Sequence, residues 1–309
     1  MTSDYKKIFD PASISRTSSS EKASTQASIG DRAGPGGYVY SDDIVLAINV
    51  ALASGRPLLV RGPSGTGKSS LARSVASELG HSFFEIVVTA RTEAHDFLLQ
   101  IDHLRRLRDA QTGGSSIELL NYAFPGPLFW GFDPAKAKKL LDDTKRSELT
   151  PKGFRADAAG ATILVDEIDK ADPDVPNSLL GPLGQLAFDL PDPGLTVAAD
   201  KPPLVIITTN EERDLPAAFL RRCVELEIVV PGKDTLVRIG KAHMPDADGE
   251  LLEHVAEMVD GYSTDSGRAI SAAEYLDTVR TCQKLGIDLN DTTLQSVAVA
   301  TLWKQDRKR

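Results

Sequence analysis

The sequence predicts an α/β fold, in which a parallel sheet has helices on both faces, followed by a small all-helical domain. Short apolar strand patterns alternate with helical patterns from residue 57 to residue 209, and such alternation is typical of a parallel sheet. After Pro231 the strand patterns stop and amphipathic helical patterns follow. A glycine-rich segment, RGPSGTGKSS at residues 61–70, directly follows the first apolar strand.

The individual elements follow from local signals along the chain. Residues 1–36 are rich in Ser, Thr and charge and predict a disordered arm. Residues 37–231 are expected to form the α/β domain, and residues 232–309 the helical one. The domain should open with a helix that Ser41 caps and Gly55 ends. Strands are expected at 57–61, 82–88, 161–166, 203–209 and 223–230, and the final helices at 232–244, 248–262, 270–286 and 292–305.

Composition narrows the class of protein. A chain of 309 residues that is 41% hydrophobic can bury a sizeable core. The chain has 35 Lys and Arg against 44 Asp and Glu, so its net charge is −9 and no overall positive field attracts nucleic acid or anionic lipid. Binding to nucleic acid would need a local basic patch. Two cysteines are too few for a disulfide framework, and no secretory leader or run of 18 apolar residues occurs. We therefore expect a cytoplasmic protein with no membrane segment.

The segment 61–70 has the pattern of a phosphate-binding loop. Its residues fit G-x-x-x-x-G-K-[ST], with the required strand before it and helix after it. Glycines let backbone N–H groups turn toward phosphate oxygens, and the helix that follows points its positive end at the same anion. Lys68 is expected to neutralise the β- and γ-phosphates of ATP, and the Ser69 hydroxyl to bind Mg²⁺. The predicted nucleotide-binding residues here are Gly62, Pro63, Ser64, Gly65, Thr66, Gly67, Lys68, Ser69 and Ser70.

Two carboxylates end a later strand, ILVDEID at residues 163–169. Ligands of open α/β sheets bind at the carboxyl ends of the strands, so Asp166 is expected to hold Mg²⁺ and Glu167 to act as the general base on water. Kinases with the same loop generally lack the second carboxylate. Its presence in this chain therefore favours hydrolysis over kinase activity. Asn210 ends the next strand, where it would reach the γ-phosphate or the water.

Two adjacent arginines, Arg221 and Arg222, follow the short helical pattern LPAAFL. One interpretation is that they complement the negative end of that helix. The other is that one of them reaches the nucleotide of a neighbouring subunit, because an arginine supplied in trans accelerates phosphoryl transfer by roughly three to five orders of magnitude. Activity would then depend on assembly.

Taken in order, GPSGTGKS, ILVDEIDKAD, IITTN and LPAAFLRRC, with a helical tail, resemble an AAA+ ATPase over about residues 38–309. Within that superfamily, FPGPLFW (124–130), DPDVPNSLLGPLGQLAFDLPD (172–192) and ITTNEERDLPAAFLRRC are most similar to the MoxR-like, dynein-related branch.

This resemblance implies a P-loop NTPase sheet of five strands in the order 5-1-4-3-2 and a helical lid at the C-terminus. It also implies a homo-oligomeric, usually hexameric ring with nucleotide between subunits, which uses ATP hydrolysis to remodel or activate a partner protein. It assigns Lys68 and Ser69 to the first nucleotide motif, Asp166 and Glu167 to the second, Asn210 to the first sensor and Arg221 or Arg222 to the arginine finger. Arg268 is its candidate for the second sensor, although a surface arginine is an equal interpretation.

Other features remain open. The resemblance suggests a von Willebrand factor A-domain protein as a partner, which this chain does not itself reveal. The segment 89–111, between the second and third predicted strands, is longer than a minimal core of this fold needs. Its arginines Arg105, Arg106 and Arg108 would either contact a client protein or form a solvated helix face, and the second interpretation is favoured. The aromatic residues Phe124, Trp130 and Phe132 are expected to pack in a core or between subunits. No histidine or cysteine spacing predicts zinc.

Two other classes of function compete with an ATP-driven remodelling machine. The first is a signalling switch that hydrolyses nucleotide slowly and presents its arm or lid to an effector protein. The second is a DNA-directed AAA+ protein, such as a relative of clamp loaders, against which the net charge of −9 argues. Turnover of ATP distinguishes the first, and salt-sensitive duplex binding the second.

Overall fold

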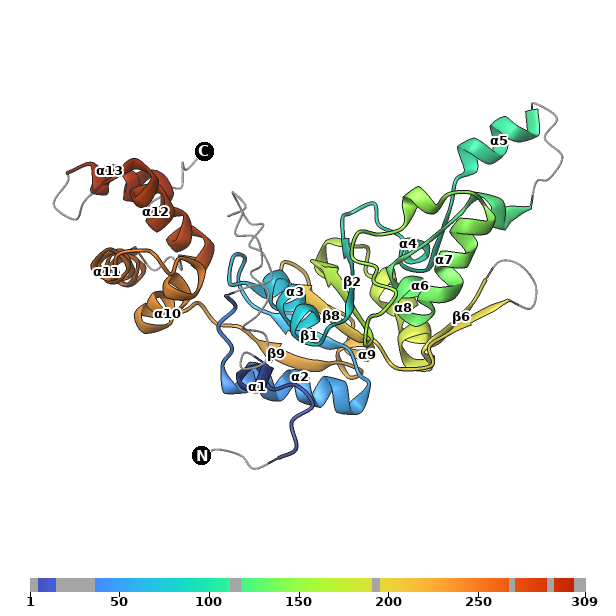
Figure 1. The fold of residues 1–309 in the computed structure, drawn as a ribbon, viewed down its shortest axis with the longest axis horizontal. Coiled ribbons are helices and arrows are strands. Elements are labelled where there is room, and N and C mark those ends of the chain that lie inside the picture. Colours follow the sequence, from blue (N-terminus) through green and yellow to red (C-terminus); the bar gives the residue numbers. More distant parts are fainter. Residues whose placement is uncertain are drawn as a thin grey trace. The chain divides into compact units, whose positions relative to one another are not determined.

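The computed structural model describes residues 5–14, 37–111, 118–190, 195–266, 270–287 and 292–302 (Figure 1). The chain divides into two compact units. The first, called the sheet unit below, consists of Met1–Ile14, Asp42–Arg61 and Val75–Leu226. The second, called the helical unit, consists of Ser15–Ser41, Gly62–Ser74 and Glu227–Arg309.

A five-stranded sheet forms the centre of the sheet unit, in the order β2-β5-β8-β1-β9. The pairs β2–β5, β5–β8 and β1–β8 are parallel. Counted along the chain, these five strands have the order 5-1-4-3-2, as the resemblance implies. Their bounds are Leu58–Arg61 (β1), Ser82–Val87 (β2), Ala161–Asp166 (β5), Leu204–Thr209 (β8) and Val224–Glu227 (β9).

Burial explains why the central strands are apolar throughout. Every residue of β8 is buried, as are the first five of β5, whereas the outer strands β2 and β9 mix buried and exposed positions. A strand that is covered on both faces has no polar alternation. The helices of this unit are Pro11–Ile14 (α1), Asp42–Ser54 (α2), Ala94–Leu98 (α4), His103–Gln111 (α5), Pro127–Phe132 (α6), Pro134–Asp143 (α7), Asp174–Gln185 (α8) and Ala217–Leu220 (α9), while Lys68–Glu78 (α3) spans both units.

The aromatic cluster is part of the core, as expected for two of its three members. Trp130 and Phe132 are buried, and the Trp130 ring lies 5.8 Å from that of Phe84 and 5.3 Å from that of Phe154. Phe124 differs, because the guanidinium of Arg146 lies over its ring at 3.7 Å. Burial lowers the pKa of Arg146, and contact with a ring face is a favourable setting for such a cation.

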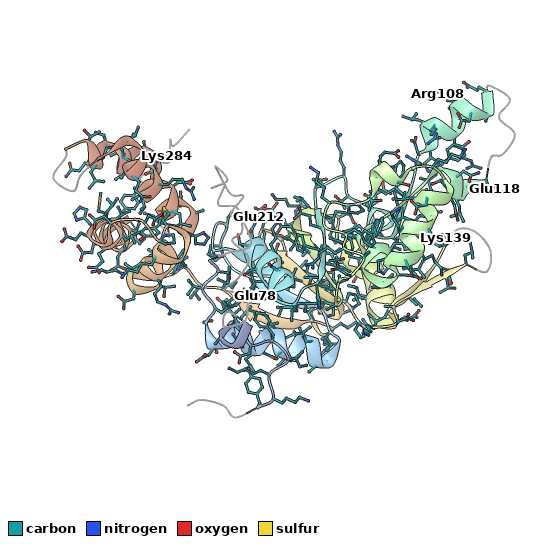
Figure 2. The ribbon with its side chains drawn as sticks, viewed as in Figure 1. Glu78, Arg108, Glu118, Lys139, Glu212 and Lys284 are labelled. Carbon is teal, nitrogen blue, oxygen red and sulfur yellow. The ribbon has the colours of Figure 1, made fainter. Side chains whose placement is uncertain are left out.

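Two small antiparallel sheets of two strands each supplement the predicted strands. One pairs β3 (Leu99–Ile101) with β4 (Ala123–Pro125), and the other pairs β6 (Ala187–Asp189) with β7 (Thr196–Ala198). The first carries α5, which projects from the sheet unit in Figure 1. No residue of α5 is buried, and its arginines Arg105, Arg106 and Arg108 lie on this projecting helix, with Arg108 labelled in Figure 2.

Part of the expected disordered arm is ordered. Phe9 is fully buried, and the buried Asn49 of α2 holds this segment by accepting from the N–H groups of Ile8 and Phe9 and donating to the carbonyl of Phe9. One apolar anchor and a satisfied buried amide outweigh the polar composition around them. The prediction of disorder is therefore wrong for residues 5–14, and the rest of the predicted arm, residues 1–4 and 15–36, lies outside the described residues.

The helical unit contains the four predicted helices, with bounds Lys233–His243 (α10), Gly249–Ser266 (α11), Ala272–Leu285 (α12) and Thr292–Thr301 (α13). Its core includes Val255, Tyr275 and Val279. The hydroxyl of the buried Tyr275 donates to the carbonyl of Leu252 at 3.1 Å. A capping box between Ser271 and Glu274 starts α12, and Gly286 in a left-handed conformation ends it.

Candidate nucleotide site

The glycine-rich loop leaves the sheet directly after β1. Gly62, Gly65 and Gly67 have φ angles of 140°, 78° and 93°, a region that residues with a Cβ atom rarely adopt. At Gly62 a Cβ would lie 2.2 Å from the carbonyl oxygen of Ile228, so only glycine fits there. The backbone conformation of the loop therefore depends on its glycines, as a phosphate cradle requires.

Lys68 lies within this loop at the first position of α3. Its side chain is only 6% exposed, and its ammonium donates to the carbonyls of Gly62 at 2.7 Å and Pro63 at 2.8 Å. Thr66 donates to the same carbonyl of Pro63 at 2.9 Å. A buried cation, a glycine-shaped backbone and the positive end of a helix are a donor set that suits a polyphosphate. Ser69 is the next residue of α3, half-buried, and its hydroxyl oxygen is a suitable ligand for Mg²⁺.

The acid pair lies at the end of β5, beside the end of β8. The buried hydroxyl of Thr208 donates to Asp166 Oδ1 at 2.6 Å and accepts from the backbone N–H of Glu167 at 2.8 Å. One hydroxyl thus orients the Asp166 carboxylate and fixes the backbone of Glu167. A hydrogen bond to a carboxylate is stronger than one between neutral groups, so this contact restricts the candidate metal ligand firmly.

Glu167 is held at both carboxylate oxygens. Its Oε1 accepts from the Asn210 amide at 3.0 Å, and its Oε2 pairs with the Lys170 ammonium at 2.6 Å. The pKa of Lys170 is raised, mainly because its ammonium donates this hydrogen bond to Glu167. Glu167 also has φ 61° and ψ 50°, a left-handed conformation that costs a non-glycine residue about 1 kcal/mol or more. Strain of this kind concentrates at functional sites.

The two arginines lie at the end of α9. Arg221 and Arg222 are both exposed, whereas their neighbours Phe219 and Cys223 are buried. The guanidinium of Arg56, which precedes β1, donates through Nε to the carbonyl of Arg222 at 3.1 Å and through Nη2 to the carbonyl of Arg221. The sequence did not indicate this contact, because Arg56 is 165 residues away from Arg221 along the chain.

The structure thus brings the acid pair and Asn210 together within the sheet unit, and Lys68 with the glycines within the helical unit. Arg268, the candidate second sensor, lies outside the described residues. The sequence analysis assigned no role to three residues that hold others of the site in place: Thr208, Lys170 and Arg56. A polar residue at the end of a buried strand was the available signal for Thr208, and the DEIDK spacing was the signal for Lys170.

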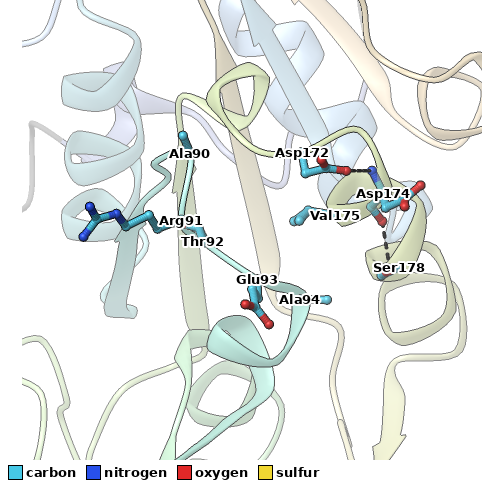
Figure 3. A pocket seen from close by; sticks show the side chains of 9 residues that line it. All are labelled: Ala90, Arg91, Thr92, Glu93, Ala94, Asp172, Asp174, Val175 and Ser178. Atoms are coloured by element: carbon cyan, nitrogen blue, oxygen red, sulfur yellow. Dashed lines mark hydrogen bonds between the residues drawn. The ribbon is translucent and has the colours of Figure 1, made fainter.

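A separate hollow of about 380 Å³ contains none of the predicted site residues (Figure 3). It lies between the loop at 90–94 and the start of α8, and both walls contribute carboxylates, Glu93 on one side and Asp172 and Asp174 on the other. Asp172 and Asp174 belong to the helix start, where the Asp174 N–H donates to Asp172 Oδ1 at 3.0 Å.

Among the helices that the structure describes, none combines the length and the apolar composition that a membrane span requires.

Comparison with known proteins adds a family to this geometry. Residues 57–223, more than half of the chain, match the family described as AAA domain (dynein-related subfamily). The chain belongs to this family. Residues 57–223 are accordingly an ATPase domain of the AAA+ class.

Curated relatives of this AAA domain are distant and longer. The katanin p60 ATPase-containing subunit A1 of Strongylocentrotus purpuratus is 26% identical over 223 residues, which cover 67% of this chain and 34% of that protein. A mitochondrial Lon protease homolog of Candida dubliniensis is 25% identical over 225 residues, covering 69% of this chain and 18% of that protein. The chain thus matches about a third or less of the length of these relatives. A solved RuvB mutant of Thermotoga maritima shares the fold, with a TM-score of 0.50 and 15% identity over 84% of this chain and 68% of that one.

Proposed function

We propose that this AAA domain binds ATP with Mg²⁺ and hydrolyses it within a homo-oligomer that remodels or activates a partner protein, as MoxR-like ATPases do. AAA+ proteins typically assemble into rings, and a hexamer is the arrangement we propose. A von Willebrand factor A-domain protein is the proposed partner class, and the cytoplasm the proposed compartment. The resemblance of residues 124–130 and 172–192 to the MoxR-like branch supports this assignment.

Each site residue has a role in this proposal. Lys68, Ser70 and the amides of the loop bind the phosphates. Ser69 and Asp166 would hold Mg²⁺, which neutralises phosphate charge when it is bound. Glu167 takes the proton of the attacking water, and Asn210 orients Glu167 and the water. Arg221 or Arg222 completes the site of a neighbouring copy.

One observation carries the proposal: the end of β8 and the residue that follows it hold the two carboxylates by different groups. The Thr208 hydroxyl binds Asp166, whereas the Asn210 amide binds Glu167. Two adjacent carboxylates with separate partners can perform separate tasks, one as a metal ligand and the other as a base. A strand that merely ended in polar residues would not need two such contacts.

A slow nucleotide-dependent switch is the second candidate, and the ion pair of Glu167 favours it. With Lys170 on one oxygen and Asn210 on the other, both contacts compete with water for the lone pairs of the carboxylate. Exchange of one partner for water would therefore favour proton transfer to Glu167. In the switch, this exchange would be rare and an effector protein would read the ATP-bound state. In the remodelling machine, assembly or a client would promote the exchange.

Replacement of Glu167 by Gln tests both candidates. We expect Glu167→Gln to bind ATP with unchanged affinity and to lose hydrolysis by about a hundredfold or more, because an amide cannot accept the proton. Glu148→Gln, an exposed glutamate of the same unit, is the matched control and should hydrolyse normally. Unchanged turnover in Glu167→Gln would contradict the assigned base.

Native mass spectrometry with a non-hydrolysable ATP analogue tests assembly in the same proteins. The machine predicts a nucleotide-dependent oligomer whose hydrolysis rate per subunit rises with protein concentration. The switch predicts persistent, nearly stoichiometric nucleotide and a slow rate that concentration does not change. Absence of nucleotide from every species would contradict both candidates.

A further inference from the structure

The turn that follows α9 presents two arginines from a firmly anchored base. Phe219 and Cys223 are 1% and 8% exposed and flank Arg221 and Arg222, which are exposed. The Cys223 thiol contacts the carbonyl of Phe219 at 3.4 Å. The apolar ends of the segment therefore fix its place in the fold, while its two cations face outward.

Arg56 binds the backbone of this turn from another part of the chain. Its guanidinium donates to the carbonyl of Arg222 at 3.1 Å and to that of Arg221. Beside it, the Val224 N–H donates to the carbonyl of Pro57 at 2.8 Å. The last carbonyls of a helix have no partner within that helix, and α9 has only four residues to hold its end in place.

The chemistry of the guanidinium suits this task. Its N–H groups form a planar fork that can bind two acceptors at once, whereas a lysine ammonium is a point donor on a flexible stem. By binding both carbonyls, Arg56 fixes the peptide units from which the side chains of Arg221 and Arg222 extend. In the described structure Arg222 itself makes only a long contact of 3.4 Å, to the carbonyl of Ala218, so its own side chain adds little restraint.

We infer that Arg56 is a positioning residue for an arginine pair that acts on the nucleotide of a neighbouring copy. This inference rests on the proposed function, because it requires Arg221 or Arg222 to act in trans. Arg56 does not take part in the hydrolytic site of its own subunit. Its loss should therefore damage a subunit as donor of the arginine and leave it intact as holder of the nucleotide.

The test uses full-length chains with substitutions on either side of the proposed interface. Arg56→Ala should reduce kcat by about ten- to hundredfold, the effect of misplacing a catalytic group by about 1 Å, with KM and ATP affinity within about twofold of the parent. Arg56→Lys should lie between the two, because one ammonium can reach one carbonyl. Arg155→Ala, which removes another exposed arginine of the sheet unit, is the matched control and should behave as the parent.

Mixing experiments separate donor from receiver. Lys68→Ala chains, which keep their arginines but bind nucleotide poorly, should restore hydrolysis when mixed with Arg56→Ala. The double variant Arg221→Ala/Arg222→Ala should also be restored by Lys68→Ala. A mixture of that double variant with Arg56→Ala should stay slow, since both chains are defective donors.

Each alternative outcome is distinguishable. Parental turnover in both Arg56→Ala and Arg56→Lys overturns the inference. If Arg56→Ala is slow and not restored by Lys68→Ala while the double variant is restored, Arg56 acts within its own subunit and the inference is wrong, although the proposed function stands. If the double variant is not restored, arginine action in trans fails, and the inference fails with it. Should Arg56→Ala not fold, Arg56→Lys carries the same comparison.

Discussion

Replacing Thr208 by Val removes the hydroxyl that joins the two acidic residues while keeping the shape of the side chain. Thr208 is fully buried, so its hydroxyl has no exchange with solvent. Val removes the donor that lies 2.6 Å from Asp166 Oδ1 and the acceptor that lies 2.8 Å from the N–H of Glu167. Both remaining groups then lose a partner in a partly buried setting, and that is the costly way to delete a hydrogen bond.

The expected loss of stability follows from these two contacts. A hydrogen bond to a charged group contributes about 1.5–3 kcal/mol, and a buried group left unsatisfied costs about 1–3 kcal/mol. Because Asp166 and Glu167 are only half-buried, we take the lower parts of these ranges and expect about 2–4 kcal/mol in total. Thr208→Ser keeps the hydroxyl and removes one methyl group, which costs about 1 kcal/mol. Val should therefore be less stable than Ser, although it fills the site better.

Urea unfolding followed by tryptophan fluorescence measures this difference within the sheet unit. Trp130 is buried there beside Phe84 and Phe154, and Trp303, the second tryptophan of the chain, is replaced by Phe in every variant. Hydrolysis by Thr208→Val should fall about ten- to hundredfold, as is typical when the group that orients a metal ligand is removed. Equal stability and equal turnover of the Val and Ser variants would refute the reasoning.

Two other predictions follow from backbone geometry and from a half-buried histidine. Gly62→Ala should abolish ATP binding, measured by calorimetry, and strongly lower the melting temperature, because its Cβ would lie 2.2 Å from the carbonyl oxygen of Ile228. Gly80→Ala is the control: Gly80 has φ 64° and nothing lies within 4 Å of the added Cβ, so this variant should lose only about 1–2 kcal/mol of stability to backbone strain. Equal effects of the two substitutions would contradict the clash at Gly62. Burial lowers the pKa of His81, so below its ordinary value of about 6.5 the unfolded chain binds the proton first and stability falls as pH falls. His81→Asn should show a shallower loss of stability between pH 7.5 and 5.5 in the same fluorescence assay, and an unchanged slope would disprove the assignment.

The fold was predictable because each strand and each loop residue carries its own local signal. The central strands β5 and β8 are apolar since both their faces are covered, and the order of the strands along the sheet agrees with the resemblance. The glycine pattern of the loop encodes a backbone shape, and the positive φ angles of Gly62, Gly65 and Gly67 show why those positions are glycine. Local patterns of this kind do not depend on the remainder of the fold.

What could not be predicted are contacts that the fold creates between distant or strained residues. Arg56 meets Arg221 and Arg222 because the chain after α9 returns beside β1, where the Val224 N–H binds Pro57. Lys170 pairs with Glu167, three residues before it, because Glu167 is itself left-handed and directly precedes the short 3₁₀ turn Ile168–Lys170. The backbone at the buried Phe9 is held by one asparagine of α2, Asn49, and a compositional argument about residues 1–36 has no access to such a contact.

The end of β8 explains why the acid pair has a defined geometry. Thr208 and Asn210 hold Asp166 and Glu167, and the next residue, Glu211, pairs with Arg61 at 3.2 Å, the last residue before the glycine-rich loop. The N–H of Glu212, labelled in Figure 2, then donates to the buried Asp169 at 3.0 Å.

One short segment therefore binds both carboxylates and the end of β1. Glu211 has φ 61°, the same left-handed conformation as Glu167 at the end of the neighbouring strand β5, so the chain turns at both strand ends. Residues that share partners in this way do not act independently. A substitution at position 208 should alter what position 210 contributes, because the Thr208 hydroxyl holds the backbone of the same Glu167 whose carboxylate Asn210 holds. The effects of the two substitutions on hydrolysis are therefore expected to be less than additive.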